Sequence, residues 1–293
     1  MNIFSAAKND YIHIQNFLIP YEHTCVLLAS YVRKESKHLY IISQKTTITE
    51  TDDIVGIIYL DKTLLHCLPT VTAVNNREPS PSFSANTELK ETLYLFFLKP
   101  ENKVICINGE KTASDYLAQI LSELDYKPEQ SNQYKLMTLE QPVIPPSDSL
   151  SNGDEIIRCT ENDIDLLLDL QKKYITKEVA PAGKQVTDLE CRLSLKQILK
   201  NQLCFALYSD GEIVAKANTN AIGLHWIQIG GVFTHPLYRR NHYAWHLVSI
   251  LCKRIQKTER KICLFVKDRN TSAHQLYLNL GFTVKQDFSI IYY

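Results

Sequence analysis

The sequence predicts an α/β protein with a mixed sheet that folds as two domains. Strand-length apolar runs alternate with amphipathic helices along the chain, which is typical of α/β proteins. A proline- and serine-rich segment, residues 141–154, separates the two halves and is predicted to be a linker. The 293 residues suffice for two domains, which we predict at residues 1–140 and 155–293.

The first half is predicted to be a smaller α/β accessory domain. Helices are predicted at 21–34 and 111–124, the second with leucine and isoleucine on one face. The apolar segment 89–98 is open between helix and strand, because so short a run does not settle its period. A long loop is predicted at 75–86. The strands of this half are predicted at 39–43, 54–60, 64–68, 103–107 and 134–139.

The second half is predicted to run two helices, a three-strand meander, helix, strand, helix and strand. A short strand at 156–158 precedes Thr160-Glu161-Asn162-Asp163, which is typical of a helix start. Ser209-Asp210-Gly211 is predicted to be a hairpin turn in the meander. The other elements are predicted as a helix at 188–201, strands at 203–208, 212–218 and 224–234, a helix at 242–256, a strand at 262–266, a helix at 270–280 and a strand at 282–292.

The composition is that of an ordinary globular protein, with 45% hydrophobic and 22% charged residues. No apolar run approaches the ~18–20 residues that span a bilayer, and no long apolar core follows a basic start, so we expect a cytoplasmic protein without a membrane partner. None of the eight cysteines lies in a CxxC pair, so no metal site is expected. Most lie in apolar stretches and are predicted to be buried thiols.

The net charge is zero, but the two halves differ in charge. Residues 1–150 hold 13 basic and 18 acidic residues, a net charge of −5, whereas residues 151–293 hold 19 and 14, a net charge of +5. Within 232–269 nine basic residues face two acidic ones, which suits an anionic ligand. Nucleic acid is disfavoured as a partner, because no recognition helix or interleaved aromatic pattern accompanies these charges.

The most informative stretch is residues 230–282. A predicted strand ends in Val232-Phe233-Thr234, a basic turn follows, and a helix begins near His242. The N-terminus of a helix favours anions, because its backbone N–H groups and its dipole both point at the ligand. Arg239 and Arg240 would add charge-assisted hydrogen bonds to phosphate oxygens. The stretch therefore predicts a site for a phosphorylated cofactor.

The segment 155–290 resembles the GCN5-related N-acetyltransferase (GNAT) family in the order of its elements and in these motifs. The pyrophosphate turn of that family runs Gln/Arg-x-x-Gly-x-Gly/Ala. Here it reads Arg239-Arg240-Asn241-His242-Tyr243-Ala244, so the first and last positions fit and His242 replaces the usual glycine. Glycine there permits a close backbone approach to the pyrophosphate. The resemblance implies a GNAT fold for residues 155–293, with acetyl-CoA as the acyl donor.

The resemblance also implies roles for three further segments. The backbone of Val232, Phe233 and Thr234 would pair with the pantetheine arm, because this strand parts from its neighbour in the family. Asn270, at the start of the last helix, would contact the same arm. Tyr277 matches the tyrosine that contacts the cofactor near its sulfur and acts as general acid. Tyr277 also lies in an apolar stripe, so a packing role stays open.

The general base is not determined by the sequence. Many relatives place a glutamate on the strand that here contains His225 and Gln228; of these two, only His225 can take a proton. Glu178 and water are further candidates. The acceptor site is expected to be shaped by Tyr174–Val186, which includes Pro181-Ala182-Gly183, and by the first domain.

The predicted function is transfer of an acetyl group from acetyl-CoA to a primary amine of a small molecule or peptide, by direct attack. The alternative is a catalytically reduced acyl-CoA-binding or regulatory protein, which His242 and the missing strand carboxylate favour. Transfer of a longer acyl group is a third reading. The sequence does not decide whether the first domain is a diverged copy of the GNAT fold or an unrelated α/β domain. It also does not decide whether the protein forms a homodimer.

Overall fold

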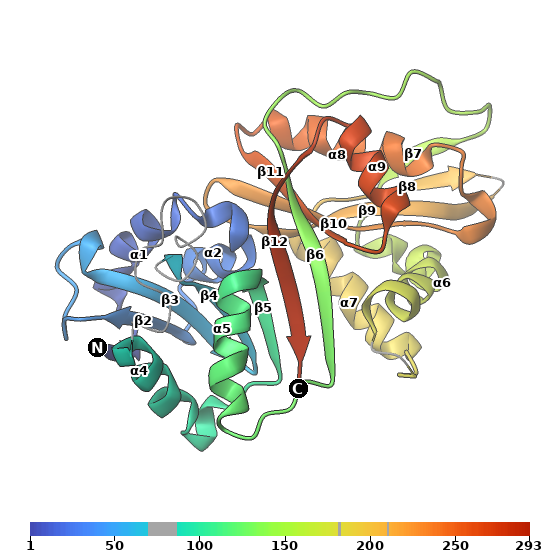
Figure 1. Ribbon diagram of the computed structural model, residues 1–293. Coiled ribbons are helices and arrows are strands. Elements are labelled where there is room, and N and C mark those ends of the chain that lie inside the picture. The colour runs from blue at the N-terminus through green and yellow to red at the C-terminus, as the bar shows by residue number, and fades with distance from the viewer. Residues whose placement is uncertain (70–86, 181–182, 210) are drawn as a thin grey trace. The chain divides into compact units, whose positions relative to one another are not determined.

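The computed structural model describes residues 1–69, 87–180, 183–209 and 211–293 (Figure 1). The predictions for the loop at 75–86, for Pro181 and Ala182, and for Asp210 in the hairpin turn lie outside these residues.

The chain forms two compact units. Unit 1 comprises Met1–Leu136, Gly223–His225 and Lys285–Tyr293, and unit 2 comprises Met137–Ile222 and Trp226–Val284.

Unit 1 is a mixed sheet with helices. Its strands follow the order β1-β2-β3-β4-β5-β12, in which only β4 and β5 run parallel. Segment 89–98, for which the sequence did not decide between helix and strand, lies in helix α4 as far as Phe97. Strand β1 and helix α1 were not predicted. The elements are β1 Asn2–Ser5, α1 Tyr11–Leu18, α2 Val26–Arg33, β2 Leu39–Ser43, β3 Ile54–Asp61, β4 Thr63–Cys67, α4 Thr87–Phe97, β5 Cys106–Glu110, α5 Lys111–Ser122, β6 Gln130–Leu139 and β12 Thr283–Tyr292.

The last strand of the chain completes the sheet of unit 1. Residues Phe288–Tyr292 of β12 pair antiparallel with Glu110–Cys106 of β5. Helix α5 begins directly after β5, where the Glu110 carboxylate accepts hydrogen bonds from the backbone N–H groups of Thr112 and Ala113, both at 2.9 Å. The predicted apolar face of this helix is buried, including Leu117.

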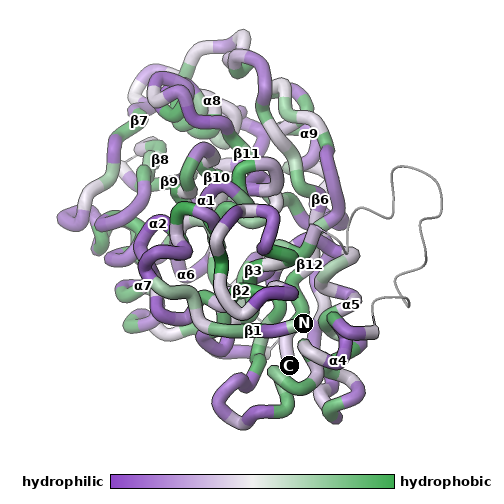
Figure 2. Tube along the Cα trace, turned by 90° about the vertical axis from the view of Figure 1, so that its left-hand side faces the viewer, coloured by the Kyte–Doolittle hydropathy of each residue, from purple (hydrophilic) through white to green (hydrophobic). Residues whose placement is uncertain are grey.

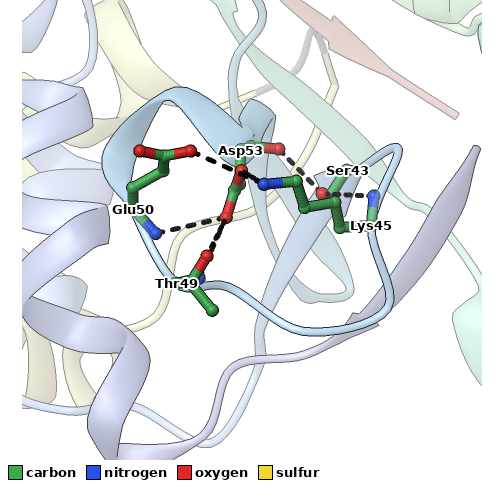
Figure 3. A network of polar contacts seen from close by, with 5 residues as sticks. All are labelled: Ser43, Lys45, Thr49, Glu50 and Asp53. Carbon is green, nitrogen blue, oxygen red and sulfur yellow. Dashed lines mark hydrogen bonds and ion pairs between the residues drawn. The ribbon is translucent and has the colours of Figure 1, made fainter.

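A polar network shapes the loop between β2 and β3 in unit 1 (Figure 3). The Asp53 carboxylate accepts hydrogen bonds from the backbone and hydroxyl of Thr49, at 2.9 and 3.0 Å, and from the Glu50 backbone at 3.1 Å. It also pairs with Lys45, and this hydrogen bond is the largest of the causes that lower the pKa of Asp53. Ser43 donates to the Asp53 carbonyl oxygen at 2.7 Å. These bonds favour the charged carboxylate.

We expect Asp53→Asn to lower the stability of unit 1 in a pH-dependent way. A carboxyl whose pKa is lowered by folding adds stability above its unfolded pKa of about 3.9, and this stability is lost as the pH falls through the native value. The stability difference between wild type and variant should therefore be full at pH 7 and shrink below about pH 4. Urea unfolding at a series of pH values measures it. The exposed neighbour Asp52 provides the control, Asp52→Asn; equal pH dependence of the two variants would contradict the expectation.

Unit 2 has the predicted order of elements up to α9, and all but the first two residues of the closing strand, β12, belong to unit 1. Its strands follow β7-β8-β9-β10-β11, and only β10 and β11 run parallel. A short π-helical turn, Ile175–Val179, extends α6. The elements are β7 Glu155–Arg158, α6 Ile164–Tyr174, α7 Asp188–Asn201, β8 Cys204–Ser209, β9 Glu212–Ile222, β10 Trp226–Thr234, α8 Tyr243–Gln256, β11 Lys261–Lys267 and α9 Thr271–Asn279.

Helices cover both faces of the unit 2 sheet. Figure 1 shows α8 and α9 on one face of strands β8–β11 and α6 and α7 on the other. Helix α8 buries the apolar face that its sequence predicts, including Leu247 and Leu251, while Lys253 and Arg254 are exposed. This alternation of hydrophobic and hydrophilic residues is visible along the trace in Figure 2. Helix α7 begins at a capping box in which Thr187 and Glu190 satisfy each other's backbone N–H groups.

The two units share one order of elements. Each runs strand, two helices, three antiparallel strands, helix, parallel strand and helix, within the residues that the structure describes, and one more strand follows each series along the chain, β6 or β12. The strands also have the same neighbours, β1 to β5 in unit 1 and β7 to β11 in unit 2. This correspondence favours the reading of the first domain as a diverged copy of the second.

The predicted linker packs along unit 2. The Ile144 backbone N–H donates to the Leu280 carbonyl oxygen at 3.1 Å, and the Ile144 carbonyl oxygen accepts from Trp245 Nε1 at 3.2 Å. Val143 is buried in the core of this unit. All eight cysteines are free and buried, so the prediction of buried thiols is confirmed.

Candidate functional site

The site is built where β10 parts from β11. The two strands pair only from Trp226 to Ile229 of β10, against Lys261 to Leu264 of β11. On its other side β10 pairs with β9, but the register shifts between Gly230 and Phe233. A β-bulge of this kind bends a strand and turns its backbone groups away from the ladder. The pairing of β10 with β11 therefore ends at Ile229, before β10 itself ends at Thr234, as the resemblance implied for this strand.

Gly231 is the centre of the bulge. Its φ is +58°, in the left-handed region that favours glycine. A Cβ atom here would lie 1.9 Å from Asn218 Oδ1, and Asn218 is fully buried. The side chain of Lys216 fills the space beside this glycine, and its Nζ donates to the Gly231 carbonyl oxygen at 3.0 Å and to Asn218 Oδ1 at 3.1 Å.

Lys216 is buried, with 1% of its surface exposed. Its Nζ lies 4.6 Å from the centre of the Tyr174 ring, a cation–π contact. Burial lowers the pKa of Lys216, and the thiols of Cys204 and Cys159 oppose this shift. Burial also raises the pKa of Tyr174 to about 12, against a smaller lowering by a hydrogen bond from the Gly231 backbone. Lys216 was missed in the sequence, where it reads as one polar residue in the apolar run Val214–Ala217.

The predicted phosphate turn leads from β10 into α8. Arg240 and His242 both have a positive φ, +67° and +55°, and α8 begins at Tyr243. His242 thus adopts the backbone conformation that glycine would adopt easily. Its Nδ1 lies 2.7 Å from Asp148 Oδ2, and this hydrogen bond lowers the pKa of Asp148. The side chain of His242, which replaces the expected glycine, is therefore hydrogen-bonded to Asp148 in the predicted linker.

The other turn residues divide into exposed and buried groups. Arg239, Arg240 and Asn241 are exposed at the start of α8, where a phosphate would meet them. Arg239 Nε donates to the Thr234 carbonyl oxygen at 3.4 Å, and its guanidinium lies 5.9 Å from the Phe233 ring.

Tyr243 is buried in the core, and its hydroxyl lies 3.4 Å from Ser209 Oγ; Ala244 is half-buried. Tyr243 and Ala244 are the first two residues of α8, and this position alone makes them part of the predicted phosphate turn.

Asn270 and Tyr277 both belong to α9. Asn270 caps the helix, since its Oδ1 accepts from the Ala273 backbone at 3.2 Å. Tyr277 is buried and packs edge-on against Phe282, with ring centres 5.8 Å apart. Burial raises the pKa of Tyr277, and Tyr174, Cys252 and Glu178 add to the rise. The phenol therefore stays protonated at neutral pH, as a general acid must.

Glu178 and Lys267 contact each other in the described structure. Lys267, at the end of β11, donates to the Glu178 backbone carbonyl at 2.5 Å, and its Nζ lies 3.8 Å from Glu178 Oε2. These contacts hold the π-helical turn after α6 against β11. Glu178 also contributes to the raised pKa of both tyrosines, so its carboxylate lies within electrostatic range of their hydroxyls.

His225 and Gln228 lie nearer the start of β10. His225 is exposed and precedes the strand, and its backbone N–H donates to the buried Glu22 carboxylate at 3.0 Å within unit 1. It is five residues before Gly230, or about 17 Å along an extended strand. Gln228 is half-buried in the paired part of β10, opposite Ala221 and Cys263. Of the predicted base candidates, Glu178 is the one that contributes to the raised pKa of Tyr277.

Two classes of site receive no support from the described parts of the chain. Within residues 1–69, 87–180, 183–209 and 211–293, no three His, Cys, Asp or Glu side chains are grouped so that they could hold a metal ion. None of the helices in those ranges combines the length and the hydropathy that crossing a membrane requires.

The sequence of residues 167–282 matches the family described as Acetyltransferase (GNAT) family. These residues carry a GNAT acetyltransferase domain, which confirms the predicted resemblance for unit 2. A comparison with curated proteins finds no match.

Solved structures resemble the chain over its whole length. A Drosophila protein aligns with a TM-score of 0.68 at 11% identity, covering 99% of this chain and 98% of its own. A GNAT-family acetyltransferase from Colwellia psychrerythraea aligns with a TM-score of 0.57 at 10% identity, covering 100% of both chains. A GCN5-related N-acetyltransferase from Sphaerobacter thermophilus aligns with a TM-score of 0.57 at 14% identity, covering 99% and 94%. At such identities the likeness shows the fold alone, and the predicted fold class is confirmed.

Proposed function

We propose that the GNAT domain in unit 2 transfers an acetyl group from acetyl-CoA to the primary amine of a small molecule or peptide. The observation that carries the proposal is the order of three features along β10 and α8. The strand parts from β11 after Ile229, it bulges at Gly231, and the exposed Arg239 and Arg240 follow at the start of α8. With this order, the extended arm of an acyl-CoA would lie along the part of β10 that does not pair with β11, and its phosphates would lie at the cationic turn.

The donor fits the residues that are present. The pyrophosphate would lie at the turn 239–244, where backbone N–H groups of the helix start and two guanidinium groups are available. The His242 side chain is bonded to Asp148, so it does not have to occupy the position of the phosphates. The backbone of Val232, Phe233 and Thr234 would pair with the pantetheine arm, and Asn270 would contact the same arm from α9.

The proposed reaction is a direct attack of the neutral amine on the thioester carbonyl. A nitrogen–carbon bond forms, the carbon–sulfur bond breaks, and the departing sulfur takes the proton of the Tyr277 hydroxyl. The amine gives its own proton to Glu178 or to water. His225 remains a weaker candidate because of its place before β10, and Gln228 would act only as a hydrogen-bond partner.

The first test is calorimetric titration of the full chain with acetyl-CoA and, in parallel, with dephospho-CoA. Micromolar binding that weakens without the 3′-phosphate, followed by thiol release when amines are added, is the expected result. Binding without thiol release to any amine would favour the second function, an acyl-CoA-binding or regulatory protein. One observation favours that alternative, namely His242 at the position of the expected glycine. The absence of binding would overturn both.

We expect Arg239→Ala combined with Arg240→Ala to weaken acetyl-CoA binding by about 10-fold or more, because two charge-assisted hydrogen bonds to phosphate are lost. The salt dependence of the affinity should become flatter. The matched control is Lys253→Ala with Arg254→Ala, which removes two exposed charges at the opposite end of α8. If both double variants bind acetyl-CoA equally well, the turn is not the pyrophosphate site.

A further inference from the structure

The buried Lys216 is connected to the proposed acyl site through a single peptide group. Its Nζ donates to the carbonyl oxygen of Gly231, at 3.0 Å. That carbonyl and the N–H of Val232 belong to the same planar peptide. The chain has no cis peptide bonds in its described residues, so the two groups point in opposite directions. The Val232 N–H therefore points away from the ammonium group.

The surroundings of Lys216 hold this peptide in one orientation. Gly231 has a left-handed backbone, and Asn218 Oδ1 occupies the space where a Cβ would be. The Gly231 carbonyl oxygen accepts from Lys216 Nζ, and the Tyr174 ring covers the Lys216 side-chain nitrogen. The carbonyl, the α-carbon and the neighbouring side chains are thus all fixed. A peptide fixed in this way keeps its N–H in place before a ligand arrives, which is what electrostatic catalysis requires.

A buried ammonium is an unusual partner for a strand carbonyl. Within the described residues no carboxylate contacts Lys216, whose Nζ contacts oxygens of Gly231 and Asn218 and the ring of Tyr174. A positive charge in a site of low dielectric polarises the peptide that accepts its hydrogen bond, so the N–H at the other end becomes a stronger donor. A neutral side chain of similar size would fill the same space without this effect.

We propose that Lys216 is a positioning residue for acyl transfer, whose charge acts through the Gly231–Val232 peptide to strengthen the Val232 N–H as a donor to the thioester oxygen. The inference rests on the proposed function for its last step only. The link between Lys216 and the Val232 N–H is a property of the protein without any ligand, and it can be measured in that state.

The first arm of the test measures the free protein by NMR with ¹⁵N-labelled valine. The Val232 amide signal is identified by its loss in Val232→Ile. We expect its proton resonance to move upfield in Lys216→Met and to stay near the wild-type position in Lys216→Arg, which keeps the charge. In the wild type it should shift as the pH rises through the lowered pKa of Lys216 and the ammonium loses its proton. A Val232 signal that is the same in Lys216→Met and wild type overturns the proposal, whatever the activity.

The second arm measures steady-state acetyl transfer to the best amine found by thiol release. Lys216→Met should lower kcat by about 10-fold, less than the 100-fold or more that removal of an oxyanion donor costs, while the Kd for acetyl-CoA changes less than about threefold. Lys216→Arg should recover most of kcat. The matched control, Lys261→Met, removes an exposed lysine at the start of β11 and should leave kcat unchanged. Wild-type kcat in Lys216→Met overturns the proposal.

The pH profile separates charge from packing. Burial lowers the pKa of Lys216, so kcat of the wild type should fall as the pH rises through this lowered pKa, and the fall should be absent in Lys216→Arg. The groups that face Lys216 are Tyr174 from α6, Cys204 from β8 and Cys159 after β7. Their titration would affect both proteins, so an equal fall in both overturns the role of the charge. If no amine is acetylated at all, the proposed function fails, and the NMR arm still decides the link to Val232.

Discussion

Replacing Tyr277 with phenylalanine should lower kcat by about 10–100-fold, the range that a general acid contributes. The departing thiolate loses its proton donor, whereas the ring and its contact with Phe282 are kept. Acetyl-CoA affinity should therefore change little, so that kcat and kcat/KM fall together. Burial raises the pKa of Tyr277, so the defect should be constant through neutral pH, where the wild-type phenol is protonated. Steady-state thiol release measures it.

The matched control for this variant is Tyr208→Phe. Tyr208 lies on β8 in the same unit and is half-buried, but it belongs to neither the turn nor α9. Its loss of a hydroxyl should leave kcat unchanged. Wild-type turnover in Tyr277→Phe would remove Tyr277 from the mechanism and leave it as a packing residue of the α9 stripe.

Replacing Gly231 with alanine should have the largest combined effect on stability and activity. The new Cβ would lie 1.9 Å from the Oδ1 of the fully buried Asn218, and the backbone would have to keep a φ of +58°. A non-glycine residue in such a strained conformation costs about 1–3 kcal/mol. Relief of the clash would move the Gly231–Val232 peptide, so acetyl transfer should fall below detection even if the domain folds. Urea unfolding and thiol release measure the two effects.

Gly230 provides the control for this substitution. A Cβ at Gly230 would approach the Asn220 side chain to 2.0 Å, but its φ is not in the left-handed region, and Asn220 is exposed and can rotate away. Gly230→Ala should therefore lower the free energy of unfolding by about 1 kcal/mol or less, roughly the net value of one hydrogen bond. Equal losses in the two variants would mean that the bulge does not depend on Gly231.

The elements of unit 2 could be predicted because their signals are local. Helix α7 has the bounds that were predicted, 188–201, since a capping box begins it and a polar segment ends it. The apolar periodicity of α8 also predicted its buried face. In unit 1, β1 and α1 were missed because they are short and carry weak patterns. Segment 89–98 could be placed in a helix only by its packing.

The parts of the site that were missed depend on contacts distant in the sequence. Helices cover both faces of the sheet in unit 2. The alternation of side chains along β9 therefore does not show on which face of the sheet a lysine lies. Lys216 is buried because Tyr174, 42 positions earlier, covers it. The partner of His242 is Asp148, 94 positions away in the predicted linker. The sequence showed that a glycine was missing from the turn, but not that the histidine side chain has a partner.

The pairing of β12 with β5 has a consequence for synthesis of the chain on the ribosome. Strand β5 receives Phe288–Tyr292 as its neighbour, and these residues emerge after every residue of unit 2. Nascent domains ordinarily fold in the order in which they are made. Until β12 has been made, one edge of β5 in the N-terminal unit stays unpaired. An unpaired strand edge is a template for pairing with other chains. The half of the protein that is translated first is therefore the last to be finished.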